Sequence, residues 1–317
     1  MYTQTICSGA ERNLRQLEYF LAAAKQRSLG RAAETSNISQ PAISKAIREL
    51  ERELGVSLLN RLPRGVETTH YGEILELRAT SILRALARAE DELKAIKAGE
   101  TGTISVGVGS SMRLKLLPDA ILRLISRHPK VEFRVISKLQ DGLIEDVQKG
   151  NIEIAICELS ISESNPTTTE IPLYADSMRA AVRREHDLLK KPNLKPADCL
   201  EYDWILPPSK HLQRDRLDSL FLNLGLPRLN PAVESESTLF AMSLLKRCDM
   251  ISWHPKSVIE EFSDQVALLP VSEFELPRKV GIVHMADMQF TTATRMLVDE
   301  LQTGSRNMID IGRVSAP

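Results

Sequence analysis

The segment Ser39–Gly55 constrains the fold more than any other stretch, because it carries the signals of one complete helix. The hydroxyl of Ser39 can cap the first turn, and Pro41 sits near the start, where a missing N–H costs nothing. Gly55 can adopt the left-handed conformation that ends a helix. Apolar residues at i, i+4, i+7 and i+11 predict one buried stripe, formed by Ile43, Ile47, Leu50 and Leu54.

The opposite face of this helix is polar and begins with Gln40, Ser44, Lys45 and Arg48. An amide suits adenine, a hydroxyl suits several base edges, and a cation suits guanine or phosphate. The segment is therefore predicted to be a DNA recognition helix.

Two further helices are expected before it. Leu14–Lys25 has an apolar stripe, and Ser28 can cap a short helix over 29–35. A long helix, a short helix, a tight turn at 36–39 and a second long helix follow the helix-turn-helix plan. Periodicity alone also allows a plain three-helix bundle, but the polar face and the tight turn favour DNA binding. Residues 1–13 are polar and lack periodicity, so we expect a disordered arm there.

A small hairpin is predicted after the recognition helix. Strand-like stretches flank the turn Pro63–Gly65, and a hairpin beside a recognition helix is a wing. Arg61 and Arg64 would then lie against phosphate or in the minor groove. The alternative is a solvated basic turn.

A long helix should follow, from a cap at Thr69 to about residue 98. Its apolar residues are spaced alternately four and three apart, which is an a/d heptad seam. We predict a dimerisation helix, because paired DNA half-sites match two-fold symmetry. Residues 97–102 should form the hinge. The seam residues are Leu75, Ala79, Ile82, Leu86, Ala89, Leu93 and Ile96.

From residue 103 the pattern changes to alternating strands and helices. Buried strands are expected over 104–109, 131–136 and 152–156, with helices between them, which predicts a parallel sheet with right-handed crossovers. Further strands are expected near 178–182, 203–206, 231–233, 250–252 and 279–284, and helices near 212–224, 237–247 and 291–301.

Composition excludes several classes of protein. The net charge is −1, but residues 1–99 carry +3 and the remainder −4, which weakly supports DNA binding by the N-terminal part. The four cysteines and six histidines are scattered without metal or redox spacing. No membrane span, signal peptide, nucleophile elbow or nucleotide-binding loop is evident. We therefore expect a cytoplasmic protein with no catalytic residue, no metal and no cofactor.

The N-terminal hundred residues resemble the LysR-type transcriptional regulators. One departure is Ser36, where that family usually has leucine, so looser packing behind the recognition helix is expected. The length and layout extend the resemblance over the whole chain. The matching positions are Phe20, Ala23, Ser28–Leu29, Ala32–Ala33, Ser39–Ser44, Ile47, Leu50–Glu51, Leu54–Gly55, Leu58, Arg61, Arg64–Val66, Thr69 and Gly72–Glu73.

The resemblance implies an α plus α/β architecture. It places a winged helix-turn-helix at 14–69, a dimerisation helix and hinge at 70–101, and an effector domain at 102–317 that resembles type 2 periplasmic binding proteins. Lobe I would comprise about 102–172 and 276–303, and lobe II about 173–275. The implied partners are an operator in double-stranded DNA, a small-molecule effector, a second copy in a homodimer or homotetramer, and RNA polymerase if the protein activates rather than represses; no membrane is involved. The residues expected to meet DNA are Ser28, Arg31, Ser39, Gln40, Pro41, Ser44, Lys45, Arg48, Arg61, Arg64 and Thr69.

An effector site is expected where strands end and helices begin, because free N–H groups gather there. Hydroxyls at helix N-termini favour an anionic ligand, and a small carboxylate is suspected. Each serine could instead serve only as a helix cap. The rival functions are an enzyme or solute-binding protein built on the α/β domain, and a coiled-coil adaptor without DNA binding. The expected effector residues are Ser110, Ser111, Ser137, Gln140, Glu158, Ser235 and Ser237.

Overall fold

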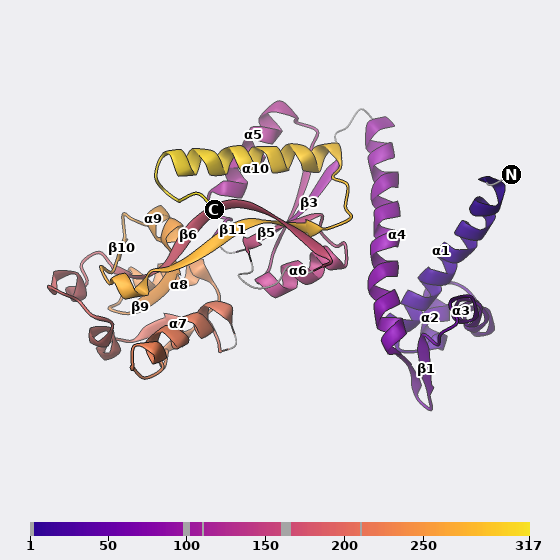
Figure 1. The fold of residues 1–317 in the computed structure, drawn as a ribbon, viewed down its shortest axis with the longest axis horizontal. Helices are drawn as coiled ribbons and strands as arrows, with labels where there is room; N and C mark the ends of the chain where they lie inside the picture. Colours follow the sequence, from indigo (N-terminus) through magenta and orange to yellow (C-terminus); the bar gives the residue numbers. More distant parts are fainter. Residues whose placement is uncertain (1–2, 98–101, 110, 160–165, 210) are drawn as a thin grey trace. The chain divides into compact units, whose positions relative to one another are not determined.

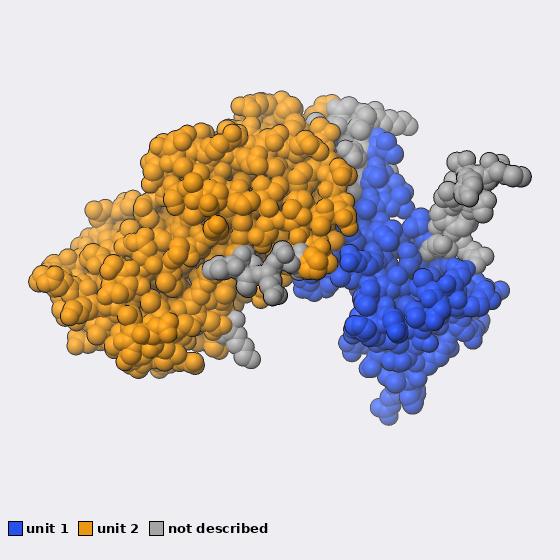
Figure 2. Space-filling model, viewed as in Figure 1, with its two compact units in different colours: residues 1–102, 145–152 blue, residues 103–144, 153–317 orange. Residues whose placement is uncertain are grey.

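The structure is a computed structural model that describes residues 3–97, 102–109, 111–159, 166–209 and 211–317. For residues 3–13, 88, 91–92 and 94–97 it describes the backbone alone. The chain divides into two compact units, one of residues 1–102 with 145–152 and the other of residues 103–144 with 153–317 (Figure 2).

The first unit begins with three helices and a two-stranded hairpin, followed by one long helix (Figure 1). The helices pack around Phe20, Ile43 and Ile47, which are fully buried. The elements are α1 (Thr3–Gln26), α2 (Leu29–Thr35), α3 (Gln40–Leu54), β1 (Leu59–Leu62), β2 (Gly65–Thr68) and α4 (His70–Lys97).

The ends of α2 and α3 follow the predicted capping. Ser28 Oγ accepts the N–H of Arg31, and Ser39 Oγ accepts the N–H of Ala42, both at 3.4 Å. Gly55 ends α3 with φ of 73°, in the left-handed region. Ser36 is itself the C-cap residue of α2, and its N–H donates to Ala32 O. The helix-turn-helix geometry therefore arises from local hydrogen bonds as well as from the core.

The start of α1 differs from the prediction. The helix begins at Thr3, so the expected disordered arm over 1–13 is wrong for residues 3–13, and residues 1 and 2 lie outside the described part. Extending an existing helix adds one hydrogen bond for each residue fixed and needs no apolar stripe. The segment also contains no proline to stop the extension.

The hairpin is held firmly against the helices. Glu51 Oε1, on α3, accepts the N–H groups of Leu58 and Leu59 at 2.8 and 3.2 Å. On the other side, the N–H of Val66 donates to Arg27 O. A Cβ at Gly65 would lie 2.3 Å from Arg27 O, so this close approach requires glycine. The wing thus has a fixed position relative to α3.

The described residues from 103 onward form a nine-stranded sheet covered by helices (Figure 1). The helices are α5 (Leu116–Arg127), α6 (Gln140–Gln148), α7 (Leu212–Asn223), α8 (Thr238–Leu245), α9 (Lys256–Glu261) and α10 (Thr292–Asp310), with short 3-10 turns at Asp187–Lys190, Pro196–Glu201 and Ser272–Phe274. The strands are β3 (Thr103–Val108), β4 (Glu132–Ser137), β5 (Ile154–Glu158), β6 (Thr168–Arg183), β7 (Trp204–Leu206), β8 (Val233–Glu234), β9 (Ile251–Pro255), β10 (Val266–Leu268) and β11 (Leu276–Met285).

The sheet order is β4-β3-β5-β11-β6-β9-β7-β8, with β10 paired to β6. β3 is parallel to both β4 and β5, as the alternating pattern predicts, whereas β11 is antiparallel to β5 and β6. The long pair β6 and β11 carries the sheet from one half of the domain to the other. Their register shifts between Val280 and Gly281, where a Cβ on the glycine would lie 2.5 Å from Ile171 O.

Helix α7 is anchored by an aromatic cluster. The ring of Phe221, on α7, stacks on Phe274 with centroids 5.7 Å apart, and both meet the edge of Trp204. All three rings are buried. Because this contact fixes the helix, the side chains of its first turns have defined positions, which matters for the site described below.

Candidate functional site

The polar face of α3 is exposed. Ile43 and Ile47 are buried in the core, whereas Gln40, Lys45 and Arg48 are exposed to solvent. The helix is capped at both ends and packed on one side, so these three side chains project from a rigid support. An amide and two cations in this arrangement can bind base edges and phosphates.

Ser44 is the exception on this face. It is buried, and its hydroxyl accepts a hydrogen bond from Arg61 Nη2 at 3.2 Å. Ser44, which was expected to contact DNA, is therefore less accessible than the rest of this face. The pair links α3 to strand β1, because the Arg61 side chain reaches back across the turn.

Several of the other expected DNA contacts also have local bonds. The hydroxyls of Ser28 and Ser39 act as helix caps, and Arg31 Nη2 donates to Gln26 O at 2.8 Å. Thr69 Oγ1 donates to Ser57 O at 2.7 Å and accepts the N–H of Gly72 at 3.0 Å. The exposed residues of the whole expected set are Arg31, Ser39, Gln40, Pro41, Lys45, Arg48, Arg61 and Arg64.

The heptad seam of α4 is divided in two. Leu75 packs against the core of the helix-turn-helix, and Ala79 is fully buried, so these two positions are not available to a partner helix. Ile82, Leu86 and Leu93 are about half exposed or more, and Ala89 is exposed. The side chain of Ile96 lies outside the described part. The apolar side chains that remain exposed are those of the C-terminal portion of the predicted seam.

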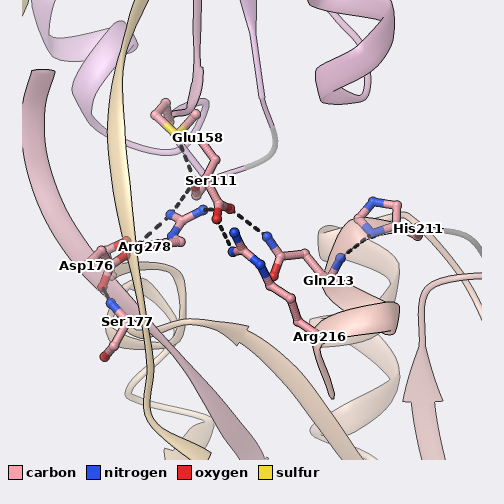
Figure 3. Close-up of polar contacts among 10 residues, drawn as sticks. Ser111, Glu158, Asp176, Ser177, His211, Gln213, Arg216 and Arg278 are labelled. Carbon is pink, nitrogen blue, oxygen red and sulfur yellow. Dashed lines mark hydrogen bonds and ion pairs between the residues drawn. The ribbon is translucent and has the colours of Figure 1, made fainter. Parts of the chain in front are cut away.

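In the α/β domain, polar side chains from α7 and β11 converge on Glu158 at the end of β5 (Figure 3). Glu158 ends β5 and is 5% exposed. Its carboxylate is bonded to Arg216 Nη1 and accepts from Gln213 Nε2 at 2.6 Å, both from α7. Arg278 Nη1, from β11, lies 3.7 Å from Glu158 Oε2. Two guanidinium groups therefore share one buried carboxylate.

Arg278 also reaches a second carboxylate and a hydroxyl. Its Nη2 donates to Ser111 Oγ at 2.8 Å and lies 3.4 Å from Asp176 Oδ2. Asp176 is the cross-strand partner of Arg278 in the β6–β11 ladder, and it also accepts from Ser257 Oγ at 2.6 Å. Two cations and two anions balance one another here, which is what allows them to be buried.

Although the charges of the described cluster around Glu158 balance, two of its polar atoms lack hydrogen-bond partners. Among the described residues, Arg278 Nε and Gln213 Oε1 are buried without a hydrogen-bond partner. An unsatisfied buried polar atom costs about 1–3 kcal/mol. The cluster therefore retains one unfilled donor and one unfilled acceptor.

The structure separates the expected effector residues. Ser111 and Glu158 belong to the cluster, and Ser110 lies outside the described residues. Within the described part of the chain, no hydrogen bond joins Ser137 or Gln140 to Glu158, and Ser137 is exposed at the end of β4. Ser235 Oγ accepts from the N–H of Ser237, and Ser237 caps α8, so these two serines act as local caps.

The central residues Arg278, Arg216, Gln213 and Asp176 escaped the sequence analysis. Gln213 and Arg216 could have been found, because they lie one helical turn apart on the first turns of a helix that follows a buried strand. Arg278 and Asp176 meet through the register of two antiparallel strands, which no local pattern specifies.

The thiols of Cys157 and Cys199 are buried and poorly suited to ionise. Burial raises the pKa of the Cys157 thiol to about 12, with smaller contributions from Glu170 and Glu158. Burial likewise raises the pKa of Cys199 to about 12, helped by Asp198. Among the described residues there is no metal-ligand cluster, and no described helix is long and apolar enough to cross a membrane.

Comparison with known proteins gives consistent matches. Residues 97–306 match the LysR substrate binding domain, and residues 14–73 match the bacterial regulatory helix-turn-helix protein, lysR family. The HTH-type transcriptional regulator GbpR of Azospirillum brasilense is 29% identical over 300 residues, covering 93% of this chain and 87% of that protein. PcaQ of Agrobacterium fabrum is 28% identical over 299 residues, covering 93% and 96%.

Two solved structures share the fold. CbnR in complex with its target DNA has a TM-score of 0.61 at 23% identity, over 92% of this chain and 99% of that one. Full-length OxyR from Pseudomonas aeruginosa has a TM-score of 0.63 at 22% identity, over 91% and 94%. The two family matches lie on the two parts of the chain that carry the exposed polar helix and the buried charged cluster. The protein therefore belongs to the LysR family of bacterial transcriptional regulators, which bind DNA, carry an effector-binding domain and are not enzymes.

Proposed function

We propose that this regulator is a cytoplasmic homodimer, assembling into a tetramer on DNA, that reads an operator with α3 and the wing and responds to a small anionic effector bound between its two lobes. Residues 14–69 bind DNA, 70–101 join the copies, and 102–317 bind the effector, with lobe I at about 102–172 and 276–303 and lobe II at about 173–275. Where the protein activates a gene, it also meets RNA polymerase.

The DNA contacts follow from what is exposed. Gln40 and Arg48 discriminate bases, whereas Lys45, Arg61 and Arg64 supply phosphate contacts. The backbone N–H groups near Ser28 and Ser39 suit phosphate oxygens, because helix N-termini attract anions. CbnR, which shares the fold, has been solved with its target DNA.

The assignment of an anionic effector rests on one observation: Arg216 and Arg278 converge on a single buried site, Glu158, from opposite sides. Guanidinium groups bind carboxylates with planar, charge-assisted hydrogen bonds. Ser111 adds a hydroxyl at the same place. A small carboxylate fits this set of donors.

A thermal-shift screen of small carboxylates against the full chain tests the effector assignment. A specific ligand raises the unfolding temperature with its concentration, and Arg216→Ala should abolish the shift while Arg295→Ala, an exposed position on α10, should not. Equal shifts in both variants would remove Arg216 from the site. Neutral ligands that stabilise the protein more than any carboxylate would contradict the anionic class.

The dimer is tested on α4. Leu86 is 43% exposed on the remaining seam, so Leu86→Asp should yield monomers in sedimentation at concentrations where the wild type is dimeric. Arg78→Asp, at an exposed position of the same helix, is the matched control. If Leu86→Asp sediments as a dimer, assembly occurs through the effector domain alone.

A further inference from the structure

In the described state, the carboxylate of Glu158 already occupies the place that the proposed effector would take. It is held by Arg216 and Gln213 of α7 and lies beside Arg278 of β11. These are the same guanidinium groups to which we assign the anionic ligand. A second carboxylate cannot join them without an excess of negative charge in a buried site, which is costly.

The contacts also join separate parts of the domain. Glu158 is the last residue of β5, opposite Val280 in the ladder with β11. Gln213 and Arg216 belong to α7, which is anchored by Phe221 to the aromatic cluster of the other half of the sheet. Glu158 therefore ties β5 to α7, and Figure 3 shows Gln213 and Arg216 reaching its carboxylate from the helix.

The hydrogen bonding of the described side chains around Glu158 is incomplete. Among the described residues of the cluster, Arg278 Nε lacks an acceptor and Gln213 Oε1 lacks a donor. A ligand with its own polar groups can fill both atoms while it neutralises the arginines. Exchange of Glu158 for a ligand carboxylate thus replaces one charge-assisted pairing by another, at little net electrostatic cost.

We propose that Glu158 is an internal stand-in for the effector carboxylate, and that the effector binds by displacing it from Arg216 and Arg278, which frees α7 from β5. This inference rests on the proposed function, since it concerns the regulation of the same site. Without ligand, Glu158 joins β5 directly to α7. With ligand, the effector carboxylate takes its place on Arg216 and Arg278, so β5 no longer contacts α7 through Glu158.

The test removes the Glu158 carboxylate by substitution and adds a small carboxylate from solution in its place. In Glu158→Ala, the two arginines lose their anion and a space remains, so sodium acetate should stabilise the variant relative to sodium chloride at equal ionic strength. Acetate at about ten times its Kd should raise the unfolding temperature by about 3–6 °C. The wild type should unfold at the same temperature in both salts. An acetate effect that is equal in both proteins, or absent from both, would overturn the proposal.

A matched control comes from a second carboxylate held by two arginines. Glu300 accepts from Arg123 Nε at 2.6 Å and from Arg127 Nη1 at 2.7 Å, but the Arg127 side chain is 65% exposed. Glu300→Ala should therefore show no acetate-specific stabilisation, because water already solvates its partners. A rise in Glu300→Ala as large as that in Glu158→Ala would indicate unspecific anion binding and contradict the stand-in role.

Glu158→Gln keeps the test decisive if the alanine variant does not fold. Glutamine preserves the shape but removes the charge, so the hold on α7 weakens. Amide hydrogen exchange in α7 should become about tenfold faster than in the wild type, while exchange in α5 stays unchanged. Unchanged exchange in α7 would overturn the proposal.

The two proposals fail differently. If no carboxylate shifts the wild type but acetate rescues Glu158→Ala, Glu158 is a latch in a regulator with another effector. If a carboxylate shifts the wild type but acetate does not rescue the variant, the effector class stands and the displacement is wrong.

Discussion

The proposed DNA-contacting surface and the proposed effector site hold their arginines in opposite ways. On α3 and the wing, Arg48 and Arg64 are exposed, and the backbone beneath them is fixed by caps and by Glu51. In the α/β domain, Arg278 is 6% exposed and is already bonded to Ser111 and paired with two carboxylates. One region presents free charge on a rigid surface, and the other neutralises its charge internally.

The difference fits the two kinds of partner that we propose. DNA is a large polyanion that attracts exposed cations from a distance and releases counterions on binding. A small effector must be enclosed, so its site has to remain stable when it is empty, and buried charges need partners in that state. Glu158 and Asp176 provide them. Substitutions in the buried cluster should therefore affect stability, and substitutions on α3 and the wing should affect DNA binding.

Arg278→Ala should have the largest effect. It leaves Glu158 and Asp176 buried with less compensation, so the free energy of unfolding should fall by about 3–5 kcal/mol in a denaturant titration. Arg123→Ala is the control, since that side chain is 32% exposed and its pair with Glu300 should contribute about 0–1 kcal/mol. Equal losses in both variants would mean that burial does not distinguish the two clusters.

Arg48→Ala should leave the stability nearly unchanged and weaken the recognition of the operator. Its unfolding free energy should change by no more than about 0.5 kcal/mol, because the side chain is exposed. Its preference for operator over unrelated DNA should fall by about 1–3 kcal/mol in competition binding. A large loss of stability would show that Arg48 supports the fold rather than the interface.

Arg64→Ala sharpens the distinction within the DNA-binding unit. At the exposed turn of the wing it should weaken binding to all sequences alike and lower the slope of log K against log salt by about 1. Binding measured from low to moderate salt on operator and random duplexes checks this. A loss confined to the operator would instead assign Arg64 to base recognition.

The buried cysteines should be unreactive. Burial raises the pKa of Cys157 and Cys199 to about 12, so little thiolate exists at neutral pH. Alkylation of these two residues, followed by mass spectrometry, should be at least about a hundredfold slower in the folded than in the unfolded chain. Similar rates would contradict their burial.

His254 should make the stability of the protein depend on pH. Burial lowers its pKa from an ordinary 6.5 to about 4, and its Nε2 lies 2.8 Å from Ser252 Oγ. Between pH 6.5 and pH 4 the unfolded chain therefore binds more protons, and stability falls as the pH falls through that window. The loss should be shallower in His254→Gln. Parallel stability curves for the two proteins would contradict the assignment.

Local signals in the sequence predicted much of this fold. The caps at Ser28 and Ser39, the stop at Gly55, the wing and the three parallel strands follow from patterns a few residues long. Periodicity could not show that Ala79 packs inside the same chain, since an apolar seam looks alike whatever covers it. It also could not place Arg278 beside Asp176 or α7 beside Glu158, because those contacts depend on strand register and tertiary packing.

The central claim is that the exposed face of α3 reads an operator. Nuclease footprinting on the DNA upstream of the gene tests it most directly, with the wild type compared with the double variant Gln40→Ala and Arg48→Ala. We predict a defined protected site for the wild type and only diffuse, salt-sensitive protection for the variant. The same protected site in both proteins would contradict the assignment of α3 as the recognition helix.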